Sequence, residues 1–444
     1  MSKILIKNAL IVNEGKSYKG NLLIENEQIS KISENFIDSD DADVIDAEGL
    51  YLLPGVIDDQ VHFREPGLTH KADIGTESRA AVAGGVTSFM EMPNTKPATT
   101  SLELLEDKFE IASHSSIANY SFYLGATNDN LDIVSNLDPK ITCGVKVFMG
   151  SSTGNMLVDQ KKVLEGIFAE CPTIITTHCE DEQTIRNNIE IFRQRYGDNI
   201  PIEAHPLIRS NEACVRSTDL AISLAEKYGS KLHVLHLSTK EEMSLFDSKP
   251  LEEKRITGEV CVHHLWFTDA DYAQKGNFIK WNPAVKSIED RDALRTALRK
   301  GKLDVVATDH APHTLTEKSN SYLTAPSGGP LVQHSLTMML ELVDQGIFTI
   351  EEVVAKMCHS PAILFSVNKR GFIREGYYAD LVLVKPNSRW KVEASNILYK
   401  CGWSPLEGSM LNNEVKMTFV NGFLAYSNGS VNEGKQGQRL TFNR

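Results

Sequence analysis

The sequence predicts an α/β protein, a (β/α)8 TIM barrel that carries a small β-sandwich domain built from both ends of the chain. Two observations predict this fold. Short apolar runs and helix-like stretches alternate for about eight steps over roughly 320 residues. Strand-like segments with turn residues occupy both ends of the chain. A doubly wound open sheet is the structural alternative, but no GxGxxG motif follows its first strand.

The predicted barrel strands are short and rich in β-branched residues, as buried parallel strands are. The first is the apolar run that ends at Ile57. The others lie at residues 86–90, 120–124, 144–148, 173–177, 232–236, 256–262 and 305–308. Residues 217–228 and 290–300 are typical of the helices between them. We therefore assign residues 54–374 to a TIM-barrel catalytic domain.

The two ends of the chain contain the strands of the predicted small domain. These strands lie at residues 4–6, 9–12, 21–24, 29–32, 379–384 and 415–420. Asn421-Gly422 after the last of them is a strong hairpin signal, because both residues tolerate positive φ. Residues 1–53 plus 375–444 are therefore expected to form one small β domain.

Composition narrows the classes of function. Of the 444 residues, 41% are apolar and 24% charged, which is ordinary for a globular protein. A net charge of −13 argues against nucleic acid or an anionic membrane as a partner. No apolar run approaches the ~20 residues that span a bilayer, and the N-terminus lacks a signal-peptide core. Seven cysteines without a CxxC pair indicate reduced thiols in a cytoplasmic protein.

Chemically active side chains lie at the ends of the predicted strands, where TIM barrels build their active sites. They are His62, Asn94, Lys146, His178, His236 and Asp309. A single buried histidine is more often structural than a ligand, and a strand-end aspartate is often a helix cap. A buried, unpaired lysine is harder to explain, because burying an ammonium group is costly. The joint occurrence of these residues on different strands predicts one site.

The residue types of this site suit metal-assisted hydrolysis. Histidine and carboxylate ligands fit Zn²⁺ or a similar ion, which lowers the pKa of bound water. Asp309 could then transfer a proton as general acid and base. Arg64 offers a planar fork for a carboxylate, and Asn94, Asn282 and His313 offer hydrogen-bond partners. The pattern indicates cleavage of an amide-like bond in a small anionic molecule.

At this point the motifs resemble a known family, the amidohydrolase superfamily, and specifically its class I dihydroorotases. The resemblance covers essentially the whole chain. Its motifs lie at residues 54–58, 61–67, 92–95, 145–148, 177–180, 236–238, 259–265, 281–283 and 308–313. Arg64-Glu65-Pro66-Gly67 favours dihydroorotase over allantoinase or hydantoinase.

The resemblance implies a role for each candidate residue. The implied metal ligands, for one or two zinc ions per subunit, are His62, Lys146, His178, His236 and Asp309. CO₂ would carboxylate Lys146, which turns it into a bridging ligand. Arg64, Asn94 and His313 would hold the substrate's carboxylate, and Asn282 the pyrimidine ring.

The implied reaction is the reversible cyclisation of N-carbamoyl-L-aspartate to L-dihydroorotate in pyrimidine biosynthesis. Metal-activated hydroxide would act with Asp309 as general acid and base. We expect a small-molecule substrate and a homo-oligomer, and an association with another pyrimidine-pathway enzyme stays open.

Gln60 is the main departure from the family pattern, which has His-x-His where this chain has Gln60-Val61-His62. An amide oxygen is a weak ligand beside imidazole, so the metal near the first strand should bind less tightly. Two alternatives follow. The chain could be an inactive homologue that serves as a structural partner of another pyrimidine enzyme, or a cyclic amidase of the allantoinase or hydantoinase type.

Overall fold

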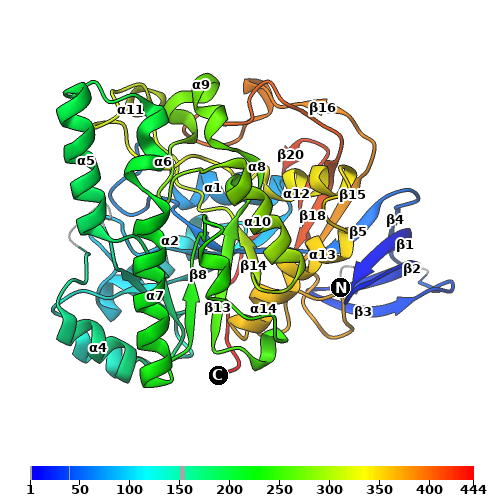
Figure 1. Cartoon of the computed structure of the whole chain (residues 1–444). Helices are drawn as coiled ribbons and strands as arrows, with labels where there is room; N and C mark the ends of the chain where they lie inside the picture. The colour runs from blue at the N-terminus through cyan, green and yellow to red at the C-terminus, as the bar shows by residue number, and fades with distance from the viewer. Residues whose placement is uncertain (1–2, 40, 151–155) are drawn as a thin grey trace.

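A parallel barrel forms the larger part of this computed structural model, which describes residues 3–39, 41–150 and 156–444 (Figure 1). Three of its strands, β6 (Val56–Val61), β7 (Val86–Glu91) and β8 (Asn119–Phe122), form one sheet. A six-stranded sheet contains β9 (Leu124–Gly125), β10 (Val145–Phe148), β11 (Ile175–His178), β12 (Leu232–Val234), β13 (Ile256–Cys261) and β14 (Val305–Ala307).

The two sheets close into one barrel. Val61 and His310 form a parallel bridge, and the His62 amide donates to the His310 carbonyl at 2.7 Å. On the other side, β8 and β9 are two halves of one strand that Tyr123 interrupts. The predicted TIM barrel is confirmed.

Several strands are shorter than the sequence predicts. The predicted strand 120–124 breaks at Tyr123, whose buried hydroxyl donates to the Asp59 carbonyl at 3.0 Å. The predicted strands 232–236 and 305–308 end before His236 and Asp309. Both residues have positive φ, 42° and 47°, which no β-strand accommodates.

Helices surround the barrel, and none of those in the described part of the chain is long and apolar enough to cross a membrane. The longer helices are α1 (Ile74–Ala83), α2 (Leu102–Ser115), α4 (Lys161–Glu170), α5 (Glu182–Tyr196), α7 (Asn211–Tyr228), α10 (Ile288–Arg299) and α12 (Ser335–Asp344). The shorter ones are α3 (Leu131–Ser135), α6 (His205–Ile208), α8 (Val262–Trp266), α9 (Tyr272–Lys275), α11 (Leu315–Lys318), α13 (Ile350–Val354) and α14 (Ser360–Leu364).

The limits of α7 show how local sequence fixes a helix. The sequence predicts a helix from residue 217, but the helix begins at Asn211 because the Ser210 side chain accepts from the Ala213 amide. It ends at Gly229, which adopts the left-handed conformation with φ 71°.

Both ends of the chain contribute to one nine-stranded sheet beside the barrel (Figure 1). Its N-terminal strands are β1 (Lys3–Asn13), β2 (Lys16–Glu25), β3 (Gln28–Ser33), β4 (Asp43–Asp46) and β5 (Tyr51–Pro54). Its C-terminal strands are β15 (Leu381–Lys385), β18 (Glu414–Val420), β19 (Phe423–Ser427) and β20 (Ser430–Val431). The short pair β16 (Trp390–Lys391) and β17 (Met410–Leu411) forms a separate sheet. The small β domain built from both termini is thus present, while its residue boundaries stay a prediction.

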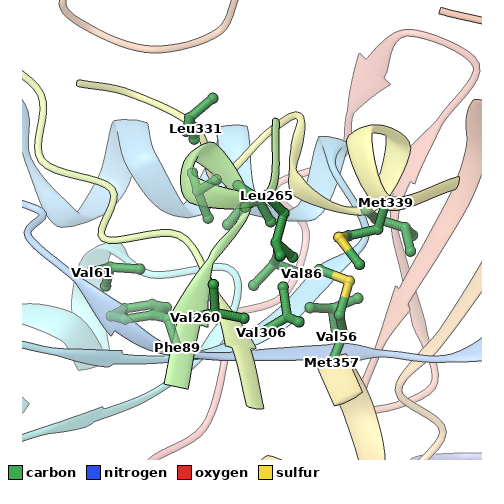
Figure 2. Packing of buried hydrophobic residues seen from close by; sticks show 14 of the residues in the cluster. Val56, Val61, Val86, Phe89, Val260, Leu265, Val306, Leu331, Met339 and Met357 are labelled. Atoms are coloured by element: carbon green, nitrogen blue, oxygen red, sulfur yellow. The ribbon is translucent and has the colours of Figure 1, made fainter. Parts of the chain in front are cut away.

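The turn between β18 and β19 agrees with the hairpin that the sequence predicts. Asn421 and Gly422 form the tight turn between β18 and β19, and both have positive φ, 50° and 73°. The hydrophobic core lies between the barrel strands and the helices. Figure 2 shows side chains of this core, among them Val56, Val86, Val260, Val306, Leu265 and Met339. Such close packing holds the strand ends rigidly.

Candidate metal centre and substrate cavity

One cavity at the C-terminal end of the barrel brings the predicted site residues together. Its polar lining residues are Gln60, His62, Arg64, Asn94, Lys146, His178, His236, Asn282, Asp309 and His313. Phe148, Ala311, Ser327 and Gly328 complete the lining. All the residues that the sequence predicts to bind metal or substrate thus line one cavity. Their individual roles stay predictions.

His62 connects the first strand to the last. Its Nδ1 lies 2.8 Å from Asn94 Oδ1, and its Nε2 lies 3.0 Å from Asp309 Oδ1. Burial lowers the pKa of His62, although Asp309 opposes this, so the neutral ring is favoured. A neutral ring that donates through Nδ1 turns its Nε2 lone pair toward a carboxylate oxygen. A cation bound by both His62 Nε2 and Asp309 Oδ1 would satisfy these two acceptors.

His178 and His236 form a second group of candidate ligands. His178 Nδ1 lies 3.0 Å from His236 Nε2, and within the described chain the buried Nδ1 of His236 has no hydrogen-bond partner. Burial lowers the pKa of both imidazoles, that of His236 strongly. Neutral rings with an unpartnered nitrogen are suited to bind a metal ion.

Glu180 orients His178 from outside the cavity. Its Oε2 lies 3.1 Å from His178 Nε2, and it also pairs with Arg209. Burial alone would raise the pKa of Glu180, but Arg209 and His178 lower it to about 2. The carboxylate is therefore ionised at neutral pH and holds the imidazole in place.

Lys146 is buried on β10, with only 1% of its surface exposed. Its ammonium group has no hydrogen bond or ion pair with any described residue, and lies 4.9 Å from the ring centre of Phe148. Burial lowers the pKa of Lys146 to about 8, with Asp309 opposing the shift. A partly neutral amine inside the cavity is the form that reacts with CO₂.

Three residues of the cavity have a left-handed backbone. Arg64, His236 and Asp309 have φ values of 71°, 42° and 47°. Such conformations cost on the order of 1–3 kcal/mol for a residue other than glycine and cluster at functional sites. Here they turn the chain at three strand ends so that the side chains enter the cavity.

A second corner of the cavity suits an anion. Arg64 Nε donates to the Pro312 carbonyl at 3.1 Å, and Nη2 lies 3.0 Å from His313 Nε2. Lys71 Nζ lies 2.9 Å from His313 Nδ1 and 2.8 Å from Glu317. Burial lowers the pKa of Arg64 to about 10, so the guanidinium remains charged at neutral pH. Burial also lowers the pKa of His313 well below its usual value, which leaves a neutral ring beside two cations.

Gln60 turns its amide group toward Asp309. Its Nε2 lies 3.3 Å from Asp309 Oδ1, and its Oε1 accepts from the Cys261 thiol at 3.6 Å. Asp58, which lies two residues before Gln60 on β6, does not line the cavity. Its carboxyl group accepts from Thr308, at 2.6 Å from the hydroxyl, and so fixes the residue next to Asp309.

The remaining buried histidines near the barrel lie outside the cavity lining. His310 pairs with Glu77 at 2.7 Å, and His264 contacts the Pro283 carbonyl at 3.2 Å. Two compact buried clusters also have the ligand types for a metal ion. They are Cys261, His263 and His264, and Asp59, His233 and Glu259. Neither set was predicted from the sequence.

Three lysines around the cavity were not predicted from the sequence. Lys71 contacts His313, whereas Lys280 and Lys318 hold the segment that contains Ser327 and Gly328. No motif pointed to them, because lysines in loops are usually exposed. Their signal lies only in the folded structure, where Lys318 is 1% exposed.

The chain belongs to the amidohydrolase family, whose model matches residues 51–424. This family is generally metal-dependent, and the unpartnered histidine nitrogens and the buried lysine of the cavity fit such a centre.

Among proteins named dihydroorotase, that of Methanosarcina acetivorans is 32% identical over 418 residues, 92% of this chain and 89% of its own. That of Carboxydothermus hydrogenoformans is 33% identical over 431 residues, covering 95% of this chain and 98% of its own. Among solved structures, L-hydantoinase (dihydropyrimidinase) from Arthrobacter aurescens superimposes with a TM-score of 0.94 at 27% identity. The match covers 99% of this chain and 100% of that one. The chain is thus a hydrolase of the amidohydrolase family, and it resembles dihydroorotases in sequence.

Proposed function

We propose that this protein is a zinc-dependent dihydroorotase, which interconverts N-carbamoyl-L-aspartate and L-dihydroorotate in pyrimidine biosynthesis. One observation carries the proposal. The buried guanidinium of Arg64 opens into the same cavity as the candidate ligands His62, Lys146, His178, His236 and Asp309. The identity of 31–33% to several dihydroorotases supports it.

The Arg64 corner is what favours this substrate over other cyclic amides. L-dihydroorotate has a carboxylate on its ring, whereas the ring of hydantoin has none. A buried arginine without a carboxylate partner is costly, and a substrate carboxylate would compensate its charge. Among the described residues Arg64 contacts only the Pro312 carbonyl and His313 through its side chain. Asn94 also lines the cavity, where its Oδ1 contacts His62.

Asp309 would move the proton of the reaction. A divalent metal ion, held by His62, Lys146, His178, His236 and Asp309, would supply acidified water and a polarised amide carbonyl. In ring opening, the water oxygen bonds to the amide carbon, the carbon–nitrogen bond breaks, and Asp309 carries a water proton to the leaving nitrogen. In ring closure, the carbamoyl nitrogen bonds to the carboxyl carbon, and Asp309 carries the proton lost by that nitrogen to the departing hydroxide, which leaves as water. Asn282, which also lines the cavity, would orient the pyrimidine ring.

Lys146 would enter this site as a carbamate. The ammonium group would first lose one proton. The neutral amine would then bond to the carbon of CO₂ and lose a second proton, so that an unpartnered cation becomes a carbamate anion. The isolation of Nζ inside the cavity supports this reaction, because an ammonium group there lacks any charged hydrogen-bond partner in the described chain. A carbamate on Lys146 would also balance the positive charge of bound metal.

A hydantoinase-type amidase is the second candidate, since the superimposable structures include proteins named L-hydantoinase and dihydropyrimidinase. The inactive-homologue alternative is not favoured. Five candidate ligands converge in one cavity, an arrangement without purpose in a purely structural partner. Oligomeric state, association with another pathway enzyme and location in the cytoplasm stay predictions.

A substrate panel separates the two active candidates. Zinc-loaded protein is assayed with L-dihydroorotate, hydantoin and dihydrouracil under identical conditions. We expect kcat/KM to be highest for L-dihydroorotate. A higher kcat/KM for hydantoin or dihydrouracil would identify a hydantoinase-type amidase. No turnover of any of the three substrates would favour the inactive homologue.

A further inference from the structure

The segment Tyr322–Gly328 forms one wall of the cavity through Ser327 and Gly328. It follows the short helix α11 and contains no regular secondary structure apart from turns. It also sets the anion corner, because its Ser327 carbonyl lies 3.0 Å from Nε2 of His313. The position of this wall therefore determines where His313, and with it Arg64, can bind a carboxylate.

Lys318 holds the far end of the wall. Its Nζ donates to the carbonyls of Gly328 at 2.7 Å, Pro326 at 3.0 Å and Lys280 at 3.4 Å. The side chain is 1% exposed. Three acceptors match the three N–H donors of an ammonium group, so the carbonyls replace its hydration shell.

Lys280 holds the near end of the wall. Its Nζ donates to the carbonyls of Tyr322 and Ala325, both at 2.6 Å, and lies 4.4 Å from the Tyr322 ring centre. The Lys280 carbonyl accepts from the Gly328 amide at 2.8 Å. The two lysines together bind four carbonyl groups of a segment that is itself neither strand nor helix.

Neither lysine pairs with a carboxylate in the described part of the chain, in contrast to the buried pairs Lys108–Glu91 and Lys254–Asp304. Burial accordingly lowers the pKa of Lys280 to about 7 and that of Lys318 as well. These two buried amines bind only main-chain oxygens. Their hydrogen bonds therefore stabilise the backbone of the wall and form no ion pair.

We propose that Lys280 and Lys318 are positioning residues that fix the Tyr322–Gly328 wall and thereby pre-organise the carboxylate-binding corner. This inference rests on the proposed function only in naming the ligand as a carboxylate. The wall should already be rigid before substrate binds. Binding is then stronger, because less conformational entropy of the wall is lost when the substrate binds.

The test compares Lys280→Met and Lys318→Met with the control Lys254→Met. Lys254 is equally buried and binds Asp304 and the Gly301 carbonyl, at the opposite end of the barrel. Hydrogen exchange is followed at the amides of Tyr322–Gly328 in zinc-loaded protein without substrate. We expect exchange there to accelerate at least about tenfold in the two wall variants and not in the control.

Kinetics with L-dihydroorotate provide the second readout. The wall variants should raise KM about tenfold and change kcat much less, because the lysines do not touch the reacting atoms. Unchanged exchange in both wall variants would overturn the inference. If exchange accelerates in the wall variants but the wild type does not turn over L-dihydroorotate, the role of the two lysines is supported and the proposed function is refuted. If a methionine variant does not fold, Lys280→Gln or Lys318→Gln replaces it, because the uncharged glutamine amide keeps two N–H donors.

Discussion

The side-chain amide of Gln60 donates toward the carboxylate of Asp309, with 3.3 Å between Nε2 and Oδ1. The amide oxygen points instead to the Cys261 thiol, 3.6 Å away. Gln60 thus presents hydrogens, not a lone pair, to the place where His62 and Asp309 could share a cation. The group of Lys146, His178 and His236 has no such competitor, so metal should bind there more tightly.

Replacing Gln60 should therefore change the metal content. Wild-type protein dialysed at limiting zinc should retain about one equivalent, and Gln60→His about two, because imidazole is the better ligand. Elemental analysis of both proteins measures this, with Gln60→Ala as the control that adds no ligand. Two tightly bound equivalents in the wild type would contradict this division of the site.

Lys146 should carry CO₂. Protein equilibrated with ¹³C-bicarbonate should show a carbamate resonance in its carbon NMR spectrum, and Lys146→Met should lack it while binding less zinc. Lys108→Met removes another buried lysine, one that is paired with Glu91 at 2.7 Å, and should leave the resonance unchanged. A spectrum without a carbamate signal in zinc-loaded wild type would rule the modification out.

Arg64→Met should weaken binding of the carboxylate substrate. Loss of a charge-assisted hydrogen bond costs about 2 kcal/mol, or roughly 30-fold in kcat/KM for L-dihydroorotate. Slow turnover of hydantoin, which lacks the carboxylate, serves as the internal control and should not fall. An equal fall in kcat/KM for L-dihydroorotate and hydantoin would show that Arg64 does not select for the carboxylate.

Glu259 should act through His236. Its Oε1 accepts from the His236 amide at 3.0 Å, which fixes a residue with a left-handed backbone. Glu259→Gln keeps an acceptor, whereas Glu259→Leu removes it. We expect zinc affinity, measured by chelator competition, to fall about 10- to 100-fold in the leucine variant and less in the glutamine variant. Identical affinities in all three proteins would show that the bond has no effect on the metal.

Glu180 should make the metal-free protein sensitive to acid. Because its folded pKa of about 2 lies below its unfolded value, its stabilising contribution is complete above pH 4.5 and is lost as the pH falls toward 2. For this buried group the loss is on the order of 3 kcal/mol in the free energy of unfolding. Denaturant titrations between pH 5 and pH 3 measure about 2 kcal/mol of this loss, and Arg209→Met should flatten the dependence. The same slope in both proteins would exclude the Arg209–Glu180 pair as its origin.

The sequence predicted those parts that local chemistry encodes. Buried strands such as 86–90 and 305–308 are mostly apolar, and His62, His178 and Asp309 lie at or just after the ends of such strands. The break at Tyr123 depends on one hydroxyl that meets the Asp59 carbonyl, a contact that no periodicity reveals. The wall lysines 280 and 318 bind main-chain carbonyls, whose positions exist only after folding.

The most direct test of the account follows ring closure in real time. Zinc-loaded wild type and Asp309→Asn are incubated with N-carbamoyl-L-aspartate at mildly acidic pH, where protonation favours the cyclic product, and L-dihydroorotate is measured by chromatography. The account predicts steady formation of L-dihydroorotate by the wild type, abolished by chelation, and at least about a hundredfold slower formation by Asp309→Asn. Product formation at the uncatalysed rate by zinc-loaded wild type would contradict it.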